Sequence, residues 1–235
     1  VNYKLMIKKI IFLLKSKTNI RIILLFLIQK IINIFDKNKI KKEKKLFLSL
    51  VSNLNISTEF FSVNAYNFYK HLSCLKSNFK YLEIGSFEGG SAIFVSNKFK
   101  KSLIFCVDNW VKTEDGYSNL NFNDVEKNFD FNTKNYQNII KIKNNSNDFF
   151  SENKQNFDVI YVDGYHKSDQ VFQDCVNSWK NLNLGGILIC DDYIWSHYPE
   201  VKHNPCYGVN KFIKTLKNDY KILQVSNSQI FFKKI

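Results

Sequence analysis

Acidic residues follow two apolar runs in the second half of the chain, and a histidine lies close to one of them. Asp163 begins the segment Asp163-Gly-Tyr-His166, and the pair Asp191-Asp192 follows the next apolar run. If both runs are neighbouring parallel strands, which lie about 4.8 Å apart, these carboxylates share one small volume. Several carboxylates cannot all stay ionised there without compensation, so we expect either a bound divalent cation or an unusual protonation state.

The adjacent pair Asp191 and Asp192 places a condition on that metal site. Consecutive strand residues point to opposite faces, so both can bind one ion only if the backbone leaves strand geometry there. The alternative is a salt-bridged or helix-capping role for one member of the pair.

A glycine-containing turn, E-I-G-S-F-E-G-G-S, spans residues 83–91 after another apolar run. Glycines allow a tight turn and let the backbone approach a ligand closely before a helix begins. The dinucleotide fingerprint G-x-G-x-x-G is not met, because Phe87 takes the position of its second glycine. This mismatch disfavours a nicotinamide-dependent oxidoreductase, and an ordinary strand-to-helix turn is the alternative for the loop.

Two further apolar runs end in polar residues. Asp108 follows the run 102–107, where a carboxylate either accepts both hydroxyls of a nucleoside ribose or caps a turn. Asn145 and Ser146 follow the run 138–142, and they either contact an adenine ring or cap the next helix.

The elements that position these residues alternate from residue 79 onward. Short apolar runs separated by helical stretches predict an α/β fold, a doubly wound, mostly parallel Rossmann-like sheet of five strands. Two runs split by Ser-Asn-Ser predict a terminal antiparallel hairpin. The predicted strands are 79–84, 102–107, 138–142, 157–162, 186–190, 220–225 and 229–234. The predicted helices are 90–98, 122–134, 146–153, 168–182 and 208–218.

Charge separates residues 1–45 from the rest of the chain. Residues 1–45 hold 13 Lys or Arg and 2 acids, whereas residues 46–235 hold 21 Lys or Arg and 19 acids. We interpret residues 1–45 as a basic, amphipathic helical extension ending in a solvated linker over 37–45. The extension lies on an anionic membrane surface, or packs on the body or on a second subunit. Its longest apolar run has 7 residues, whereas a spanning helix needs about 20.

The remaining region, 46–235, divides into a helical cap over 46–78 and the alternating core over 79–235. Aromatic residues crowd the cap, and we expect most of them in the core and a minority along a cleft. The nearly neutral body argues against nucleic acid as a partner. The 5 cysteines form no CxxC pair, which is typical of free thiols in a reducing, cytoplasmic compartment.

Taken together, the loop over 83–91, the D-G-x-H at 163–166 and the G-G-x-x-x-x-D-D at 185–192 resemble class I S-adenosylmethionine-dependent methyltransferases. The match is nearest to the small-molecule and sugar O-methyltransferases, and it covers residues 79–235. The resemblance implies S-adenosylmethionine as the cofactor. The residues implied to surround it are Glu83, Gly85, Ser86, Gly89, Ser91, Asp108, Asn145 and Ser146. Asn145 departs from the family, where Asp is common.

The same resemblance implies a magnesium-like ion bound by Asp163, Asp191 and Asp192, with His166 as the base. We therefore predict metal-assisted O-methylation of a small-molecule or glycan acceptor, a sugar or another polyhydroxylated metabolite. One alternative is a nicotinamide-dependent oxidoreductase. The other is a membrane-tethered, non-catalytic binding module of the same fold, at the inner face of a membrane. A homo-oligomer is compatible with each.

Overall fold

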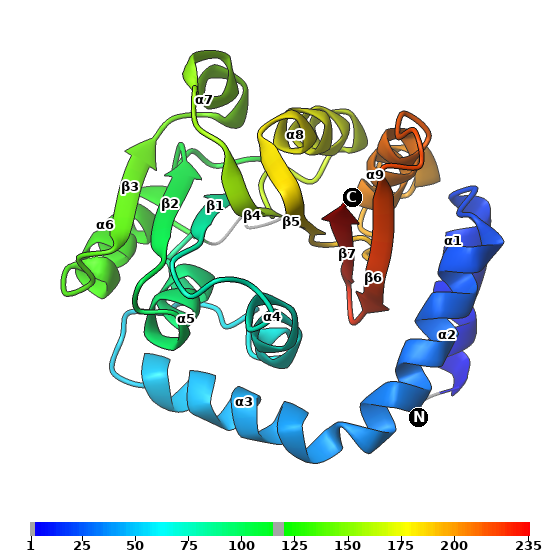
Figure 1. Cartoon of the computed structure of the whole chain (residues 1–235), viewed down its shortest axis with the longest axis horizontal. Coiled ribbons are helices and arrows are strands. Elements are labelled where there is room, and N and C mark those ends of the chain that lie inside the picture. Colours follow the sequence, from blue (N-terminus) through cyan, green and yellow to red (C-terminus); the bar gives the residue numbers. More distant parts are fainter. Residues whose placement is uncertain (1–2, 115–119) are drawn as a thin grey trace.

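The computed structural model describes residues 3–114 and 120–235, with a seven-stranded sheet through its centre (Figure 1). The strands are β1 (Lys80–Ile84), β2 (Leu103–Asp108), β3 (Ile139–Lys143), β4 (Phe157–Val162), β5 (Leu182–Cys190), β6 (Tyr220–Ser226) and β7 (Gln229–Lys234). Their order is β3-β2-β1-β4-β5-β7-β6. The first five strands are parallel, and β7 runs antiparallel to β5 and β6. The predicted doubly wound sheet with its terminal hairpin is confirmed.

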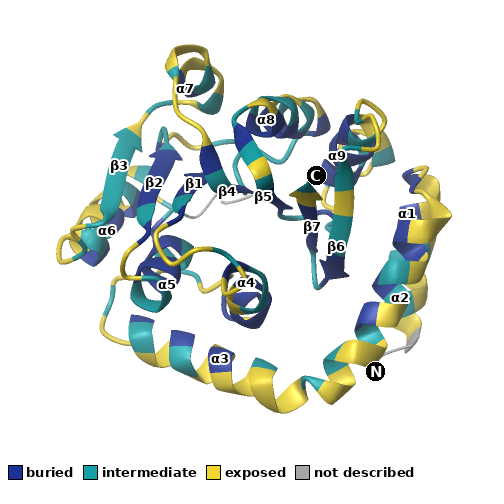
Figure 2. Ribbon diagram, in the orientation of Figure 1, coloured by how far each residue is buried: buried dark blue, intermediate teal, exposed yellow. Residues whose placement is uncertain are grey.

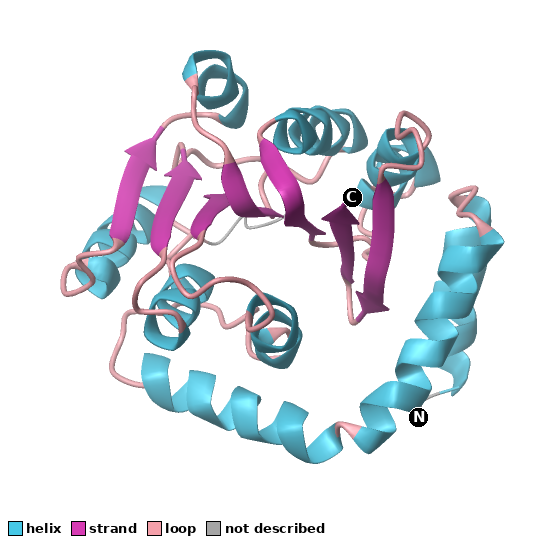
Figure 3. Cartoon of the chain, in the orientation of Figure 1, coloured by secondary structure: helices cyan, strands magenta, loops and turns pink. Residues whose placement is uncertain are grey.

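Helices cover both faces of the sheet (Figure 3). They are α1 (Tyr3–Lys15), α2 (Ile20–Phe35), α3 (Lys37–Val51), α4 (Ala65–Leu72), α5 (Gly90–Lys98), α6 (Phe122–Thr133), α7 (Ser146–Glu152), α8 (Ser168–Lys180) and α9 (Pro205–Ile213), with a 3₁₀ turn η1 (Val201–His203). Helices α7, α8 and α9 lie on one face and α4, α5 and α6 on the other. Helix α9 begins earlier than the predicted 208–218, because Pro205 occupies its first turn.

The central strands alternate their side chains between the two helical layers. In β1, Leu82 and Ile84 face the layer of α7 to α9, whereas Tyr81 packs in the opposite layer. Four of the five β1 residues are buried, as expected for a parallel strand covered on both faces. This alternation determines on which face of the sheet the first residue after each strand lies.

Helix α2 closes the β6 edge of the sheet (Figure 1). Its residues Ile22, Ile23 and Phe26 are buried in the main core, and Asn33 Nδ2 donates to Ser226 Oγ at 3.1 Å. A covered edge cannot pair with strands of another chain, so α2 is part of the fold. Within the described residues, every helix falls short of the length and hydropathy that crossing a bilayer requires.

The prediction of a linker over 37–45 is wrong, because helix α3 runs without a break from Lys37 to Val51. Most residues of 37–45 are exposed, as expected for a solvated segment. The α3 residues Glu43, Phe47 and Val51 recur at four-residue spacing and are all buried. Glu43 Oε2 lies 2.6 Å from the Lys98 ammonium of α5. Helical periodicity and this ion pair attach α3 to the body beneath α4 and α5.

Candidate active site

A pocket of about 550 Å³ opens at the carboxyl ends of the parallel strands. Gly85, Asp108 and Asp163, which follow or end three different strands, all line it. Parallel strands end at the same edge of the sheet, which is where ligands bind in doubly wound folds. These three residues from different strand ends therefore share one cleft. A smaller cavity of about 80 Å³ adjoins it, and Ser86 and Ser91 line that cavity.

The loop after β1 is shaped by two glycines in left-handed backbone. Gly85 has φ +86° and donates its N–H to the Val107 carbonyl at 2.9 Å. Gly89 has φ +83° and sits immediately before α5. Such φ values favour glycine because other residues meet a steric penalty there. Phe87 also has a left-handed backbone, at φ +48°, although it is not a glycine. It lines the pocket.

Glu83 lies beneath this loop and lines neither cavity. Its carboxylate is fully buried and accepts hydrogen bonds from the Tyr81 hydroxyl at 2.7 Å and from Ser91 Oγ at 2.9 Å. Burial raises the pKa of Glu83 to about 8, because desolvation penalises the charged form. Glu83 and Gly89 thus act on the pocket through the loop that they hold.

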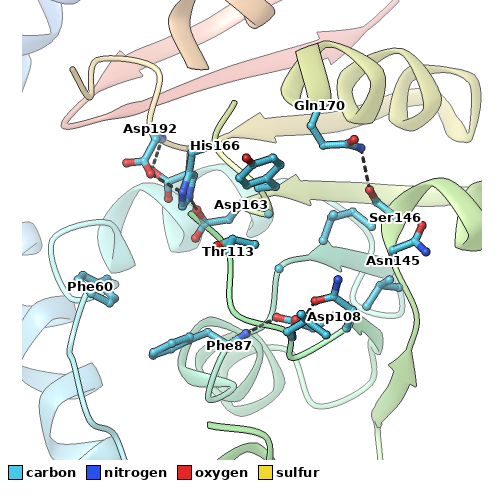
Figure 4. Close-up of a pocket in the computed structure, with 18 of the residues that line it drawn as sticks. Phe60, Phe87, Asp108, Thr113, Asn145, Ser146, Asp163, His166, Gln170 and Asp192 are labelled. Atoms are coloured by element: carbon cyan, nitrogen blue, oxygen red, sulfur yellow. Dashed lines mark hydrogen bonds and ion pairs between the residues drawn. The ribbon is translucent and has the colours of Figure 1, made fainter. Parts of the chain in front are cut away.

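Asp108 lies on the wall of the pocket beside that loop (Figure 4). Its Oδ2 accepts the N–H of Phe87 at 2.9 Å, and its Oδ1 accepts the N–H of Trp110 at 2.7 Å. Burial raises the pKa of Asp108, while these backbone hydrogen bonds oppose that rise. A carboxylate held in this way still has lone pairs to offer to ligand hydroxyls.

Asn145 and Ser146 serve the next helix and the pocket at the same time. Asn145 caps α7, since its Oδ1 accepts the N–H of Asp148 at 2.9 Å. Ser146 Oγ accepts from Gln170 Nε2 at 3.1 Å, as Figure 4 shows. Both residues line the pocket. The two roles considered for this segment, capping and ligand contact, are therefore compatible.

Three ligand-type side chains converge after β4 and β5 (Figure 4). Each of Asp163, His166 and Asp192 offers one ligand atom, and these atoms lie within 4.8 Å of one another. His166 Nε2 is 3.1 Å from Asp192 Oδ2 and 3.7 Å from Asp163 Oδ1. Strand β5 ends at Cys190, and Asp192 has φ +53°. The backbone has left strand geometry there, which allows Asp192 to turn toward His166.

The carboxylate of Asp191 is held by different partners. Its Oδ2 accepts from Gln229 Nε2 at 2.7 Å and from the Tyr161 hydroxyl, and its Oδ1 accepts the N–H of Asp192 at 2.7 Å. Burial raises the pKa of Asp191 to about 6, and the charge of Asp163 adds to that rise. The structure thus brings two of the three predicted acids together with the histidine.

Strand register explains that arrangement. Val162 is paired with Cys190, so the next residues, Asp163 and Asp191, stand level with each other. The Tyr161 hydroxyl lies between them, 2.7 Å from Asp163 Oδ2 and within hydrogen-bond distance of Asp191 Oδ2, so its single proton is donated to one of the two acids at a time. Two-residue alternation puts Tyr161 on the same side as Asp163, a signal that sequence reasoning missed.

Other residues in or near the pocket are less evident from the sequence. The hairpin brings Gln229 to Asp191, and nothing in its local sequence announces that contact. Trp195 lines the pocket in the loop after β5, with its ring edge-on to His166 at 5.1 Å and stacked on His197 at 4.5 Å.

Of the aromatic residues in the helical cap over 46–78, Phe47 and Phe61 are buried in the core, whereas Phe60 is 51% exposed and lines the pocket. The expected division between core and cleft is confirmed.

A comparison with known protein families matches the segment that supplies most of the residues lining this pocket. Residues 82–193 match a family described as "Methyltransferase domain", a range that runs from β1 to just beyond Asp192. An uncharacterized protein of Acanthamoeba polyphaga mimivirus is 31% identical over 121 residues, which cover 50% of this chain and 53% of that protein. The chain thus spans about half the length of this relative.

Solved structures extend the comparison to most of the chain. MycE methyltransferase from the mycinamycin biosynthetic pathway, in complex with Mg, SAH and mycinamycin VI, is 16% identical with a TM-score of 0.58. That match covers 80% of this chain and 54% of MycE. The O-methyltransferase TomG from Streptomyces achromogenes, involved in tomaymycin synthesis and bound to SAM, is 14% identical with a TM-score of 0.53 and coverages of 82% and 89%. The chain has the Rossmann-like fold of the methyltransferases.

Proposed function

We propose that this protein is an S-adenosylmethionine-dependent O-methyltransferase that acts, with a divalent cation, on a hydroxyl of a sugar or another small polyhydroxylated metabolite. One observation carries the proposal. A single pocket joins the Asp108 wall to the cluster of Asp163, His166 and Asp192. Such a pocket can hold a methyl donor and a cation-bound acceptor side by side.

The pocket suits a nucleoside cofactor in size and chemistry. Its volume of about 550 Å³ falls within the range common for small-molecule sites. Asp108 offers acceptor capacity to ribose hydroxyls, and Asn145 and Ser146 offer polar groups on the same pocket. Ile84 and Val107 supply apolar wall between them. SAM and SAH in the complexes of TomG and MycE support this assignment.

The donor set suits a hard cation. Asp163 and Asp192 supply carboxylate oxygens, which magnesium-like ions prefer to imidazole nitrogen. We therefore assign these two acids as ligands and keep His166 for proton transfer. When bound, the cation would lower the pKa of an acceptor hydroxyl and hold it in place. The Mg in the MycE complex supports a cation in this fold.

Proton transfer would be carried out by His166 and the side chains around it. The His166 imidazole would take the proton of the acceptor hydroxyl, and the Asp192 carboxylate, 3.1 Å from its Nε2, would stabilise the charged ring that results. The Trp195 ring at 5.1 Å restricts the imidazole from one side. Alignment of acceptor and methyl group supplies much of the rate in such a displacement.

Two measurements test the proposal. Calorimetry on the full chain should detect S-adenosylmethionine binding, with NADH as the comparison ligand. A screen of nucleotide sugars, glycans and catechols should then detect acceptor-dependent release of S-adenosylhomocysteine that requires added Mg²⁺. Binding of NADH without S-adenosylmethionine would favour the oxidoreductase instead. Cofactor binding without turnover on any acceptor would favour a binding module of the same fold.

A further inference from the structure

The outer side of α2 carries a continuous apolar stripe. Ile20, Leu24, Ile28, Ile31 and Phe35 are 60, 50, 51, 58 and 83% exposed. At 3.6 residues per turn, these positions fall within roughly 80° of the helix circumference. Surface helices ordinarily present polar residues there, because their apolar face is the one that packs on the core. Here both faces are apolar, and Figure 2 shows exposed residues along the outside of α1 and α2.

The segment that carries this stripe is rich in cations, and its first acid, Asp36, is already paired with Lys39. Residues 3–35 contain 7 Lys or Arg and no Asp or Glu. Lys8 and Lys15 of α1 are exposed, whereas Lys9 and Lys30 are half-buried. Burial lowers the pKa of both, and the charge of Lys9 further lowers that of Lys30. In the described ranges, no carboxylate forms an ion pair with either lysine.

We propose that α1 and α2 dock on an anionic phospholipid surface, with the α2 stripe in the headgroup region and the lysines on lipid phosphates. Apolar residues on one side and an excess of lysine around them are the features of helices that lie in a membrane interface. Anionic headgroups supply the opposite charge that these helices lack. This role goes beyond the proposed methyl transfer and rests on different residues.

Charge argues against a second copy of the chain as the occupant. Pairing two α2 stripes would bring together two segments that each hold 13 Lys or Arg and 2 acids over residues 1–45. Like charges held at short range repel, and the helices carry no acid over 3–35 to offset them. A lipid surface removes this conflict, since it supplies negative charge and an apolar layer together.

Flotation of the full chain with lipid vesicles tests the proposal. The chain should float with phosphatidylcholine vesicles that contain phosphatidylserine and stay behind with pure phosphatidylcholine, and high salt should weaken the binding. Lys8→Glu with Lys15→Glu should reduce the bound fraction about tenfold. Lys100→Glu with Lys101→Glu, at exposed positions between α5 and β2, is the charge-matched control and should change it little.

The apolar contribution needs its own variants. Leu24→Ser with Ile28→Ser should reduce vesicle binding, whereas Leu184→Ser, at a leucine that is 80% exposed in β5, should not. Circular dichroism and S-adenosylmethionine binding on the same samples separate this result from misfolding and from failure of the proposed function. Absence of flotation, or equal flotation of all variants, would overturn the proposal. A dimer in sedimentation that Leu24→Ser with Ile28→Ser abolishes, without vesicle binding, would assign the stripe to a second copy.

Discussion

Gly85 and Asp163 meet backbone to backbone where β1 and β4 end. A β carbon on residue 85 would lie 2.1 Å from the Asp163 carbonyl oxygen, far inside van der Waals contact. The Asp163 N–H in turn donates to the Ile84 carbonyl at 2.8 Å. The glycine therefore sets how closely the loop after β1 approaches the acid cluster.

We predict that Gly85→Ala destabilises the protein by several kcal/mol, because both the positive φ and the clash must be relieved by backbone movement. Gly185→Ala is the matched control: Gly185 has φ +79°, but a β carbon there meets nothing within 4 Å. That change should cost only the left-handed penalty, about 1–2 kcal/mol. Chemical denaturation measures both. Equal losses would show that the contact with Asp163 is unimportant.

The acid cluster predicts separable effects of Asp192 and His166. Asp192→Asn should weaken Mg²⁺ binding by about 10-fold or more, since a carboxylate ligand is lost. His166→Gln should leave Mg²⁺ binding nearly unchanged and reduce turnover by about 10²- to 10⁴-fold, the usual contribution of a general base. Calorimetry with Mg²⁺ and a methyl-transfer assay distinguish them. If His166→Gln abolishes metal binding, the histidine is a ligand and the base lies elsewhere.

The buried Glu83 predicts an unusual dependence of stability on pH. Its pKa rises from 4.5 to about 8 in the folded state, so the folded chain retains a proton that the unfolded chain releases. Stability from this group is therefore highest below pH 4.5 and falls as the pH rises through 8. Glu83→Gln, which mimics the protonated form, should flatten that fall.

The size of the effect follows from the shift, at about 1.4 kcal/mol per pKa unit, and amounts to a few kcal/mol between pH 5 and 9. Denaturation of the wild type and of Glu83→Gln across this range measures it. Asp124→Gln, at an acid on the exposed start of α6, is a control that should leave the slope as it is. Parallel pH profiles for the wild type and Glu83→Gln would contradict a neutral Glu83.

The ion pair between Glu43 and Lys98 predicts that α3 contributes to stability. Their side chains are only 5 and 15% exposed, and removing one partner of a largely buried pair leaves the other uncompensated. Glu43→Gln should lower the free energy of unfolding by about 2–3 kcal/mol. Asp124→Asn, which breaks the exposed pair with Lys127, should cost less than about 1 kcal/mol. Similar losses would mean that α3 is only loosely attached.

Most of the strands and the location of the pocket could be predicted, for a local reason. Apolar runs bounded by polar turns specify strands, and the carboxyl ends of parallel strands meet at one edge. Asp108 and Asp163 each lie at a strand end. Their positions in the sequence therefore predict one shared edge of the sheet, and both line the same pocket there. The linker prediction over 37–45 fails because six lysines in that segment hide the buried spacing of Glu43, Phe47 and Val51.

By itself, then, the sequence determined the α/β fold and the set of strand-end residues, since both depend on patterns within single segments. Only the tertiary structure decided which acid joins the histidine. Register and a left-handed residue turn Asp192 toward His166 and leave Asp191 with Tyr161 and Gln229. Those choices depend on partners that are distant along the chain, and no local pattern encodes them.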